Sequence, residues 1–349
     1  MQSRRSTLFE IETLRYKHPG TIMKKCTPSQ LRRSLTIAAI SALSLSASLS
    51  SHAQTWPNKP IRIVVGFPPG GTADAMARII GQSLTESLGQ SVVIDNKPGA
   101  SGNIGASEVA RATADGHTLL ISTTSVETVN PHLIKSTLLP SRDLTPVTAI
   151  GKSQMYLVTK PQSAAKDVRE LVAQAKSGKM SCASGGTGTP PHLACELFKQ
   201  ATGTDILHVP YKGAAPALQD VLAGQADMFC DPGIAFPHIR TGKVKLLAVV
   251  SEKRSPFFPD VPTVAEQGFK GANLDIWFGM WAPNGTPADV IARLNREVAK
   301  ALASLTLKAR YAELGGENVA LDTTEFKALL TNEARVLAAL IRDQKISGE

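Results

Sequence analysis

A glycine-rich turn near the start of the chain is the first place where residue types suggest chemistry. Residues 61–80, IRIVVGFPPGGTADAMARII, run from a β-branched apolar stretch into a pattern with helical spacing. Such strand-to-helix turns direct backbone N–H groups and a helix N-terminus at anions. This turn lacks the lysine of a P-loop and the G-x-G-x-x-G spacing of dinucleotide sites. It predicts a cradle for a small anion, with a purely geometric turn as an equal alternative.

A second turn of the same kind lies further along the chain. Residues 180–198, MSCASGGTGTPPHLACELF, again give a strand, a glycine-rich turn and a helix that begins with Pro190 and Pro191. A carboxylate held by several N–H groups gains charge-assisted hydrogen bonds without a buried cation. Two neutral cradles facing one cleft therefore suit a small carboxylate better than a phosphate ester.

The same residues allow a catalytic alternative. Ser184, His192 and Asp74 are the members of a conceivable hydrolase triad, although Ser184 lacks the Gly-x-Ser-x-Gly elbow. We favour ligand binding over hydrolysis for this turn, and for Asp74 we favour a mixture of bracing the first cradle and contacting a ligand amine or water. Asp74 lies in the first turn of its predicted helix, where a carboxylate interacts favourably with the helix dipole, so we expect it to brace the first cradle.

Strands and helices alternate through most of the chain, which predicts an α/β fold with parallel sheets covered on both faces. Strands are predicted at 61–67, 91–95, 117–122, 154–159, 180–184, 206–210, 226–230 and 244–250. Helices are predicted at 73–88, 102–112, 166–177, 190–201 and 214–223. After the aromatic stretch LDIWFGMWAP, residues 274–283, we expect only helices.

The late helices must pack on a sheet that is already built, because they bring no strands of their own. We therefore predict that domain 1 comprises residues 54–157 and a helical return at 279–349, and that domain 2 comprises 158–278. A chain that crosses twice between two α/β lobes makes a hinge with a cleft. A chain of this length is also expected to form more than one domain.

The N-terminus has the features of an export signal. Basic residues precede the uncharged run LTIAAISALSLSASL, and Ser51-His52-Ala53 offers small residues for cleavage after Ala53. We expect residues 1–53 to be removed and the protein to be periplasmic, with either Met1 or Met23 as the true start. Without that segment the net charge falls from +9 to +3, because 30 Lys and Arg remain against 27 Asp and Glu. We therefore expect no nucleic-acid partner.

Three cysteines remain in the mature chain, Cys182, Cys195 and Cys230. Their spacings match no metal motif, and we expect no metal and no cofactor. A disulfide between Cys182 and Cys195 is one alternative, but we favour three small buried thiols.

Several sequence blocks together resemble a known family. They are WPNKPIRIVVGFPPGGTADAMAR, VIDNKPGASGNIG, DGHTLLIST, ASGGTGTPPHLACELF, HVPYKGAAPALQDVLAGQADMF, GKVKLLAV, PDVPTVAEQGF and APNGTPADVIARLN. These blocks cover residues 56–320 and resemble the Bug proteins, the periplasmic solute receptors of tripartite tricarboxylate transporter systems. Phe67 stands where the family often has tyrosine, and the family block around Cys182 and Cys195 usually has no cysteine.

The resemblance implies a two-lobed periplasmic-binding-protein-like fold (type II) with two hinge crossings, and no enzymatic activity. It implies a monomeric receptor that grips a small organic carboxylate with backbone amides and delivers it to the membrane subunits of the transporter. A sensor for a membrane signalling protein and a hydrolase using Ser184 and His192 are the alternatives. The expected ligand-binding residues are Phe67, Gly70, Gly71, Thr72, Asp74, Thr123, Thr124, Ser184, Gly186, Thr187, Gly188, Thr189, His192 and Asp231. Because neither cradle contains arginine, we expect an aromatic or aliphatic carboxylate rather than citrate.

Overall fold

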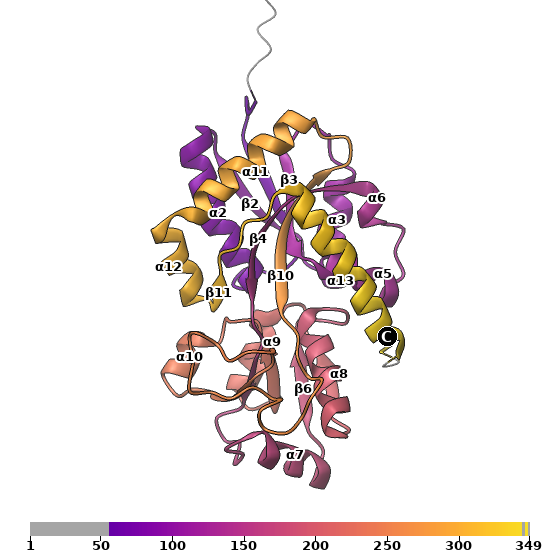
Figure 1. Cartoon of the computed structure of the whole chain (residues 1–349), viewed down its shortest axis with the longest axis vertical. Coiled ribbons are helices and arrows are strands. Elements are labelled where there is room, and N and C mark those ends of the chain that lie inside the picture. The colour runs from indigo at the N-terminus through magenta and orange to yellow at the C-terminus, as the bar shows by residue number, and fades with distance from the viewer. Residues whose placement is uncertain (1–55, 344–345, 348–349) are drawn as a thin grey trace, which may run out of the picture. The chain divides into compact units, whose positions relative to one another are not determined.

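Two β-sheets with flanking helices organise the protein. The computed structural model describes residues 56–343 and 346–347 (Figure 1). The predicted signal peptide and its cleavage site, within residues 1–53, lie outside the described residues. No helix in the described part of the chain is both long enough and apolar enough to cross a membrane.

The first sheet has six strands, in the order β11-β4-β10-β3-β1-β2. These strands are β1 (Ile61–Val65), β2 (Val92–Asn96), β3 (Thr118–Thr123), β4 (Leu144–Ser153), β10 (Ile276–Pro283) and β11 (Gly316–Glu317). Its helices are α2 (Thr72–Leu88), η1 (Ala100–Gly102), α3 (Asn103–Ala110), α4 (Ser125–Thr128), α5 (Asn130–Leu133), α6 (Pro140–Asp143), α11 (Ala288–Ala303), α12 (Leu305–Glu313) and α13 (Thr323–Asp343). We call this sheet with its helices lobe 1.

The second sheet has five strands, in the order β7-β6-β8-β5-β9. These strands are β5 (Tyr156–Thr159), β6 (Ser181–Ser184), β7 (Leu207–Pro210), β8 (Met228–Asp231) and β9 (Lys245–Val249). Its helices are α7 (Val168–Ser177), α8 (Pro190–Thr202), α9 (Ala214–Leu222) and α10 (Phe236–Arg240). We call this sheet with its helices lobe 2.

The chain crosses between the sheets twice, which accords with the predicted fold. It leaves lobe 1 after β4 and enters lobe 2 at β5, and it returns through β10. Figure 1 shows β4 and β10 side by side where they run toward lobe 2, and they pair as antiparallel neighbours. These crossings lie close to the predicted domain limits at 157/158 and 278/279, which stay predictions.

The prediction of parallel sheets is wrong for the strands next to the two points where the chain passes from one sheet to the other. β2, β1 and β3 are parallel, as are β7, β6 and β8. By contrast, β10 is antiparallel to both of its neighbours, β3 and β4, and β5 is antiparallel to β8 and β9. A strand that carries the chain back into a sheet without a crossover helix runs against its neighbours, so both sheets are mixed.

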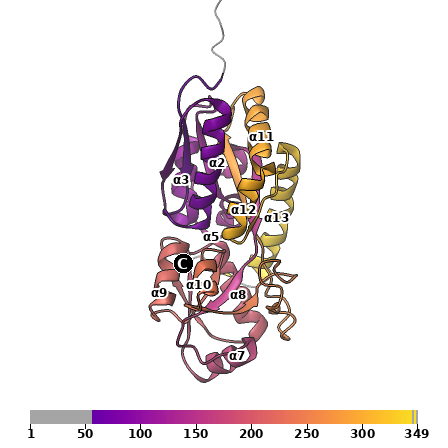
Figure 2. The ribbon, with the colours of Figure 1, turned by 90° about the vertical axis from the view of Figure 1, so that its left-hand side faces the viewer.

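Lobe 1 is buried on both faces of its sheet. In β1, Ile61, Ile63 and Val65 pack with α2 and α11 on one face, while Val64 packs with α3 and α13 on the other. Figure 2 shows the returning helices α11, α12 and α13 in the same lobe as α2 and α3. The late helices therefore do pack on the earlier sheet, as the sequence predicts. The expectation of helices alone after residue 283 is wrong, because the two-residue strand β11 pairs with β4 at the edge of this sheet.

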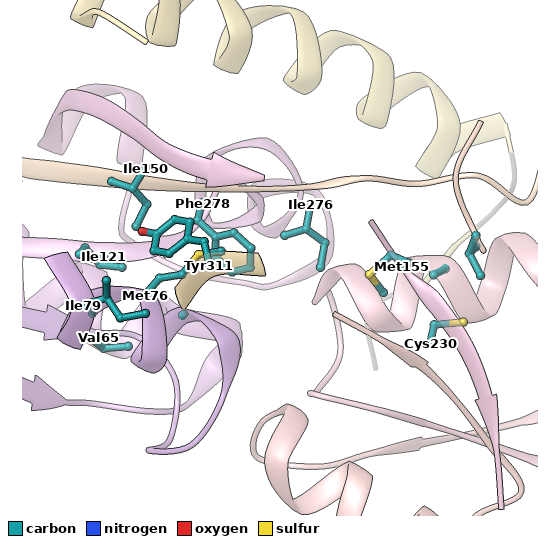
Figure 3. Close-up of a cluster of buried hydrophobic side chains, with 14 of the residues drawn as sticks. Val65, Met76, Ile79, Ile121, Ile150, Met155, Cys230, Ile276, Phe278 and Tyr311 are labelled. Carbon is teal, nitrogen blue, oxygen red and sulfur yellow. The ribbon is translucent and has the colours of Figure 1, made fainter. Parts of the chain in front are cut away.

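One hydrophobic cluster reaches from lobe 1 into lobe 2. Figure 3 labels ten of its members, Val65, Met76, Ile79, Ile121, Ile150, Met155, Cys230, Ile276, Phe278 and Tyr311. In lobe 2 the same cluster includes residues of α7 and α8, whereas α9 covers the other face of that sheet. The core thus fixes the starts of α2 and α8, from which the two predicted cradles extend.

Candidate ligand-binding cleft

The first turn presents unused N–H groups at the start of α2. Gly71 immediately precedes the helix and, because it has no side chain, cannot cap the N–H groups of the first turn. The N–H groups of Thr72 and Ala73 have no acceptor among the described residues, as expected for a first helical turn without a cap. Gly70 has φ +84°, a conformation that glycine adopts without strain. The turn therefore offers donors to an outside acceptor.

Asp74 braces this turn from behind, as predicted. Its carboxylate accepts hydrogen bonds from Gly70 N (3.0 Å), Arg78 Nε (3.0 Å) and Asn96 Nδ2 (2.9 Å). Asn96 Nδ2 also donates to the carbonyl of Phe67 at 2.9 Å. Burial alone would raise the pKa of Asp74, but the bonds from Arg78, Gly70 and Asn96 outweigh it and hold that pKa below its usual value. Asp74 stays charged and shapes the turn.

Several N–H groups of the second turn (residues 185–189) already donate to acceptors in the turn and in the residues that flank it. Gly186 N donates to Ser184 Oγ (3.1 Å) and Gly188 N donates to His192 Nδ1 (3.1 Å). Thr189 N donates back to the Gly186 carbonyl (3.1 Å). Within the described residues, the N–H groups that keep no acceptor in this turn are those of Gly185 and Thr187.

Two stacked histidines support the second turn. The rings of His192 and His208 lie 4.0 Å apart, and Ser184 Oγ lies 2.6 Å from His208 Nε2. Burial, and secondarily the charge of Lys199, lowers the pKa of His192 to about 4, so its ring is neutral and can accept the Gly188 N–H.

The catalytic alternative paired Ser184 with His192, but the structure pairs Ser184 with His208. The Ser184 side chain has no exposed surface, and its hydroxyl already serves the turn as an acceptor. This geometry favours a scaffolding role for Ser184 over a nucleophilic one.

The expectation of three free thiols is wrong. Cys182 and Cys195 form a disulfide, and Cys230 is the buried free cysteine of the described chain. Cys182 lies in β6 and Cys195 in α8, the two elements that flank the second turn. Their Cα atoms lie 6.4 Å apart, within the range that a disulfide bridges.

Both turns border a small inner cavity of about 40 Å³ between the lobes. The first residues of three helices line it, namely Thr72 of α2, Pro190 of α8 and Ala214 of α9. A helix N-terminus carries a partial positive charge, so three of them favour an anion here. The other lining residues are Phe67, Pro68, Gly71, Ala73, Thr123, Gly185, Thr189, Pro191, Pro232, Ile276 and Phe278, none of them charged.

A larger outer cavity of about 460 Å³ adjoins the inner one, since Phe67, Pro68 and Gly185 line both. Its other lining residues are Gly66, Gly99, Ala100, Ser101, Gly102, Leu133, Ile134, Lys135, Gly186, Thr187, Tyr211 and Lys212. The volume falls in the range of small-molecule sites.

Hydrogen bonds join the lobes around these cavities. Ser101 of lobe 1 donates through its hydroxyl to the Thr187 carbonyl of lobe 2. The carbonyl of Pro232 accepts from Ser153 Oγ at 2.8 Å and from Thr72 Oγ1 at 3.4 Å. In the described conformation the two lobes are therefore joined by hydrogen bonds beside the space between the turns.

The predicted site residues separate into two groups. Those that line a cavity are Phe67, Gly71, Thr72, Thr123, Gly186, Thr187 and Thr189. Those that line neither described cavity are Gly70, Asp74, Thr124, Ser184, Gly188, His192 and Asp231. Asp74 and His192 of the second group accept hydrogen bonds from the turn residues Gly70 and Gly188, so these four residues shape the turns without lining a cavity.

Asp231 and Thr124 show what the second group does. Asp231 is fully buried, and its Oδ2 accepts from Gly233 N (2.8 Å) and Ala235 N (3.0 Å). Thr124 N donates to the Trp277 carbonyl, which ties the start of α4 to β10. Both residues hold a loop that follows a strand.

Ala214 is a lining residue that sequence reasoning missed, although a signal for it exists. Residues 206–214 repeat the strand, glycine and helix order of the two recognised turns. Gly213 there has φ +134°, and an added Cβ would lie 2.6 Å from Pro68 Cδ of the opposite lobe. A third helix N-terminus reaches the cavity because glycine permits this close approach.

Comparison with known proteins gives the family. A family model described as the tripartite tricarboxylate transporter family receptor matches residues 76–346. Protein BugT of Bordetella pertussis is 36% identical over 323 residues, which cover 90% of this chain and 98% of that protein. These matches confirm the resemblance to the Bug proteins.

Solved structures agree with the fold. The periplasmic binding protein BugD superposes with a TM-score of 0.81 at 34% identity, covering 84% of this chain and 100% of BugD. A protein of R. palustris solved with adipate gives 0.80 at 34% identity, covering 84% and 100% of the two chains. MatC from Rhodopseudomonas palustris, solved with malate, gives 0.75 at 32% identity, covering 80% and 98%. The chain described here belongs to the tripartite tricarboxylate transporter receptors, which are periplasmic solute-binding proteins.

Proposed function

We propose that the protein binds a small organic carboxylate through backbone N–H groups of its two turns and delivers it to a membrane transporter. The observation that carries this proposal is the convergence of three helix N-termini on an inner cavity with no charged lining residue. The donors are the unpaired N–H groups of Thr72, Ala73, Gly185 and Thr187. Such donors suit a carboxylate because they supply charge-assisted hydrogen bonds without a cation.

The mechanism is binding coupled to lobe closure. A ligand that contacts both lobes stabilises the enclosed conformation by its difference in affinity for the open and closed states. The relatives solved with malate and adipate hold carboxylates of this kind. We propose a ligand of the same chemical class here, and we propose that the transporter's membrane subunits receive the closed receptor.

Substituting Thr72→Pro tests the role of a backbone donor directly. Thr72 is the first residue of α2, where proline is tolerated, and Gly71 before it has the extended backbone (ψ 167°) that proline requires. The substitution removes one N–H donor. A hydrogen bond to a charged group contributes about 1.5–3 kcal/mol, so calorimetry should show carboxylate binding weakened roughly ten- to a hundredfold.

Two control variants separate the loss of the Thr72 N–H from the other effects of the substitution. Thr72→Ala removes the hydroxyl that bonds Pro232 but keeps the N–H, so most of the affinity should remain. Ala288→Pro makes the same change at the first residue of α11, which lines neither cavity, and should leave binding unchanged. Equal affinity of Thr72→Pro and the wild type would contradict backbone recognition at this turn.

A thermal-shift screen identifies the ligand class. The protein from residue 54 onward, unfolded and refolded to remove any ligand carried through purification, is screened against mono-, di- and tricarboxylates, aromatic acids and amino acids. A ligand at a hundred times its dissociation constant adds about 2.7 kcal/mol of stability, which raises the melting temperature clearly. A folded protein that responds to no carboxylate would refute the proposed function.

A further inference from the structure

Three buried cysteines of lobe 2 bring their sulfur atoms together. Cys182 of β6 lies opposite Met228 of β8, and Cys230 lies two residues further along β8, so both cysteines point to the same face of the sheet. Helix α8 covers that face and contributes Cys195. The three sulfur atoms all lie within 4.8 Å of one another. The fold therefore gathers three potential ligands that no sequence motif connects.

This cluster has the dimensions of a three-sulfur site. Thiolate sulfur lies about 2.3 Å from a zinc ion, so three sulfurs around one such ion are at most about 4 Å apart. In the described state Cys182 and Cys195 form a disulfide, while Cys230 is a free thiol. The disulfide masks two of the three ligands, and a reductant that supplies two electrons and two protons exposes them. The site is thus closed by oxidation and opened by reduction.

The surroundings of the sulfur atoms favour neutral thiols over thiolate anions. None of the three cysteines has exposed surface. Burial, and secondarily the charge of Asp231, raises the pKa of Cys230 to about 12. The Ala183 carbonyl lies 3.8 Å from Cys182 Sγ and 3.7 Å from Cys195 Sγ, where it can accept from a thiol S–H. A ligand of the reduced cluster must therefore react with protonated sulfur.

The charge of the complex decides which kind of ion suits this place. Thiolate sulfur selects soft ions, and three thiolates carry three negative charges. A soft ion of charge +1 or +2 leaves a negative complex, whereas an ion of charge +3 leaves a neutral one. Lys199, one helical turn beyond Cys195, is already paired with Glu196 at 3.0 Å, and the neighbour Asp231 is itself acidic. Because an uncompensated buried charge is costly, the neutral complex is favoured.

We propose that the reduced cluster of Cys182, Cys195 and Cys230 is a binding site for a trivalent thiophilic ion, for which arsenite is the probe. Arsenous acid, As(OH)3, exchanges its three hydroxyl groups for the three sulfurs. Each arsenic–oxygen bond breaks, each thiol gives its proton to the departing hydroxyl to form water, and arsenic stays in the +3 state. The bound ion then joins β6, α8 and β8, whereas the disulfide joins β6 and α8 alone.

Arsenite binding during refolding tests the proposal. Residues Trp56–Glu349 form a compact unit, and the protein from residue 54 onward contains these three cysteines and no other. It is unfolded, reduced with a phosphine that takes an oxygen from water to become its oxide, refolded with arsenite and passed through gel filtration. Mass spectrometry measures the retained arsenic, and X-ray absorption counts the sulfur atoms around it.

Cys230→Ala is the matched variant, because it keeps the pair that forms the disulfide and removes the third ligand. The reduced wild type should retain about one arsenic per chain with three sulfur neighbours, and the variant should bind it roughly a hundredfold more weakly. The oxidised wild type should retain none. Equal affinity of the two reduced proteins would overturn the proposal, as would two sulfur neighbours and one oxygen in the wild type.

A second measurement separates a folded site from capture by an unfolded chain. An ion that binds the folded state raises the melting temperature of the reduced protein, whereas one that prefers the unfolded thiols lowers it. Arsenite should raise the melting temperature of the reduced wild type more than that of Cys230→Ala, and a fall or no change would contradict the proposal. Cys195→Ala, which also keeps two of the three cysteines, gives the same comparison if Cys230→Ala does not fold. These readouts need no carboxylate, so they are independent of the proposed function.

Discussion

Asp231 makes the stability of the protein depend on pH in a predictable direction. Its carboxyl group has no exposed surface, Oδ1 has no hydrogen-bond partner among the described residues, and burial raises its pKa to about 7 although nearby N–H groups act in the opposite sense. The ordinary value is 3.8. Below about pH 4 the folded and unfolded states both hold the proton, so this group adds no pH dependence there.

Between about pH 4 and pH 7 the unfolded state loses the proton while the folded state keeps it. The free energy of unfolding therefore falls as pH rises, by about 1.4 kcal/mol per pH unit and about 4 kcal/mol across the window. Asp231→Asn keeps an oxygen for the Gly233 and Ala235 N–H groups but cannot ionise. Its stability should not show this fall.

The assay is urea unfolding, followed by tryptophan fluorescence, of the wild type and Asp231→Asn at pH 4, 5, 6, 7 and 8. Burial also raises the pKa of Glu333 to about 7, but that group is present in both proteins and cancels in their difference. The wild type should lose about 4 kcal/mol relative to the variant between pH 4 and pH 8. Parallel stability curves over this range would refute the reasoning.

Two further predictions concern the turns themselves. Gly213→Ala places a Cβ 2.6 Å from Pro68 of the other lobe, so ligand affinity measured by calorimetry should drop at least tenfold. The control is Gly242→Ala, which also has a positive φ but nothing within 4 Å of the added Cβ, and it should bind normally. Equal affinities would show that the close approach is unnecessary. The bond between Cys182 and Cys195 closes a short loop, and its removal from the wild type by refolding with a thiol reductant should cost about 3 kcal/mol. That loss corresponds to roughly 6–12 °C in melting temperature, and an unchanged transition would contradict it.

Periodicity located most elements that build the cleft. The predicted strand at 61–67 and helix at 73–88 correspond to β1 and α2, and the second turn lies between β6 and α8 as expected. These elements are continuous in the sequence and carry their own start signals in glycine and proline. The local hydrophobic pattern is therefore sufficient to predict a helix or strand that is covered on both faces.

The crossing strands were harder to predict. β4 (Leu144–Ser153) has no prediction at all, and the aromatic stretch at 274–283 was not recognised as β10. These two strands pair over long sequence separation, with irregular register at Phe278/Gly279 and Met280/Trp281. Their pairing depends on contacts that a local window does not contain, and their bulges break the alternation that identifies a strand.

The sequence predicted the two turns that line the cavities but not the loops beside them. Backbone N–H donors can be predicted from glycines and from the starts of helices, both of which can be recognised in a single sequence. The positions of Lys135 and Lys212 depend on how a loop of lobe 1 faces a loop of lobe 2, which no local pattern records. Asp231 stays a predicted ligand contact, although its side chain is fully buried and lines neither described cavity.

The disulfide also makes the ordering of the second turn depend on the compartment in which the protein lies. Cys182 and Cys195 lie on the two elements that hold residues 185–189 between them, so the bond forms a ring around that turn. Disulfides form in oxidising compartments and are rare in the reducing cytoplasm. A copy still inside the cell would carry the same residues in an unclosed loop, with a larger entropy cost for gripping a ligand. The ordering of residues 185–189 therefore depends on the redox state of the surroundings as well as on the hydrogen bonds within the turn.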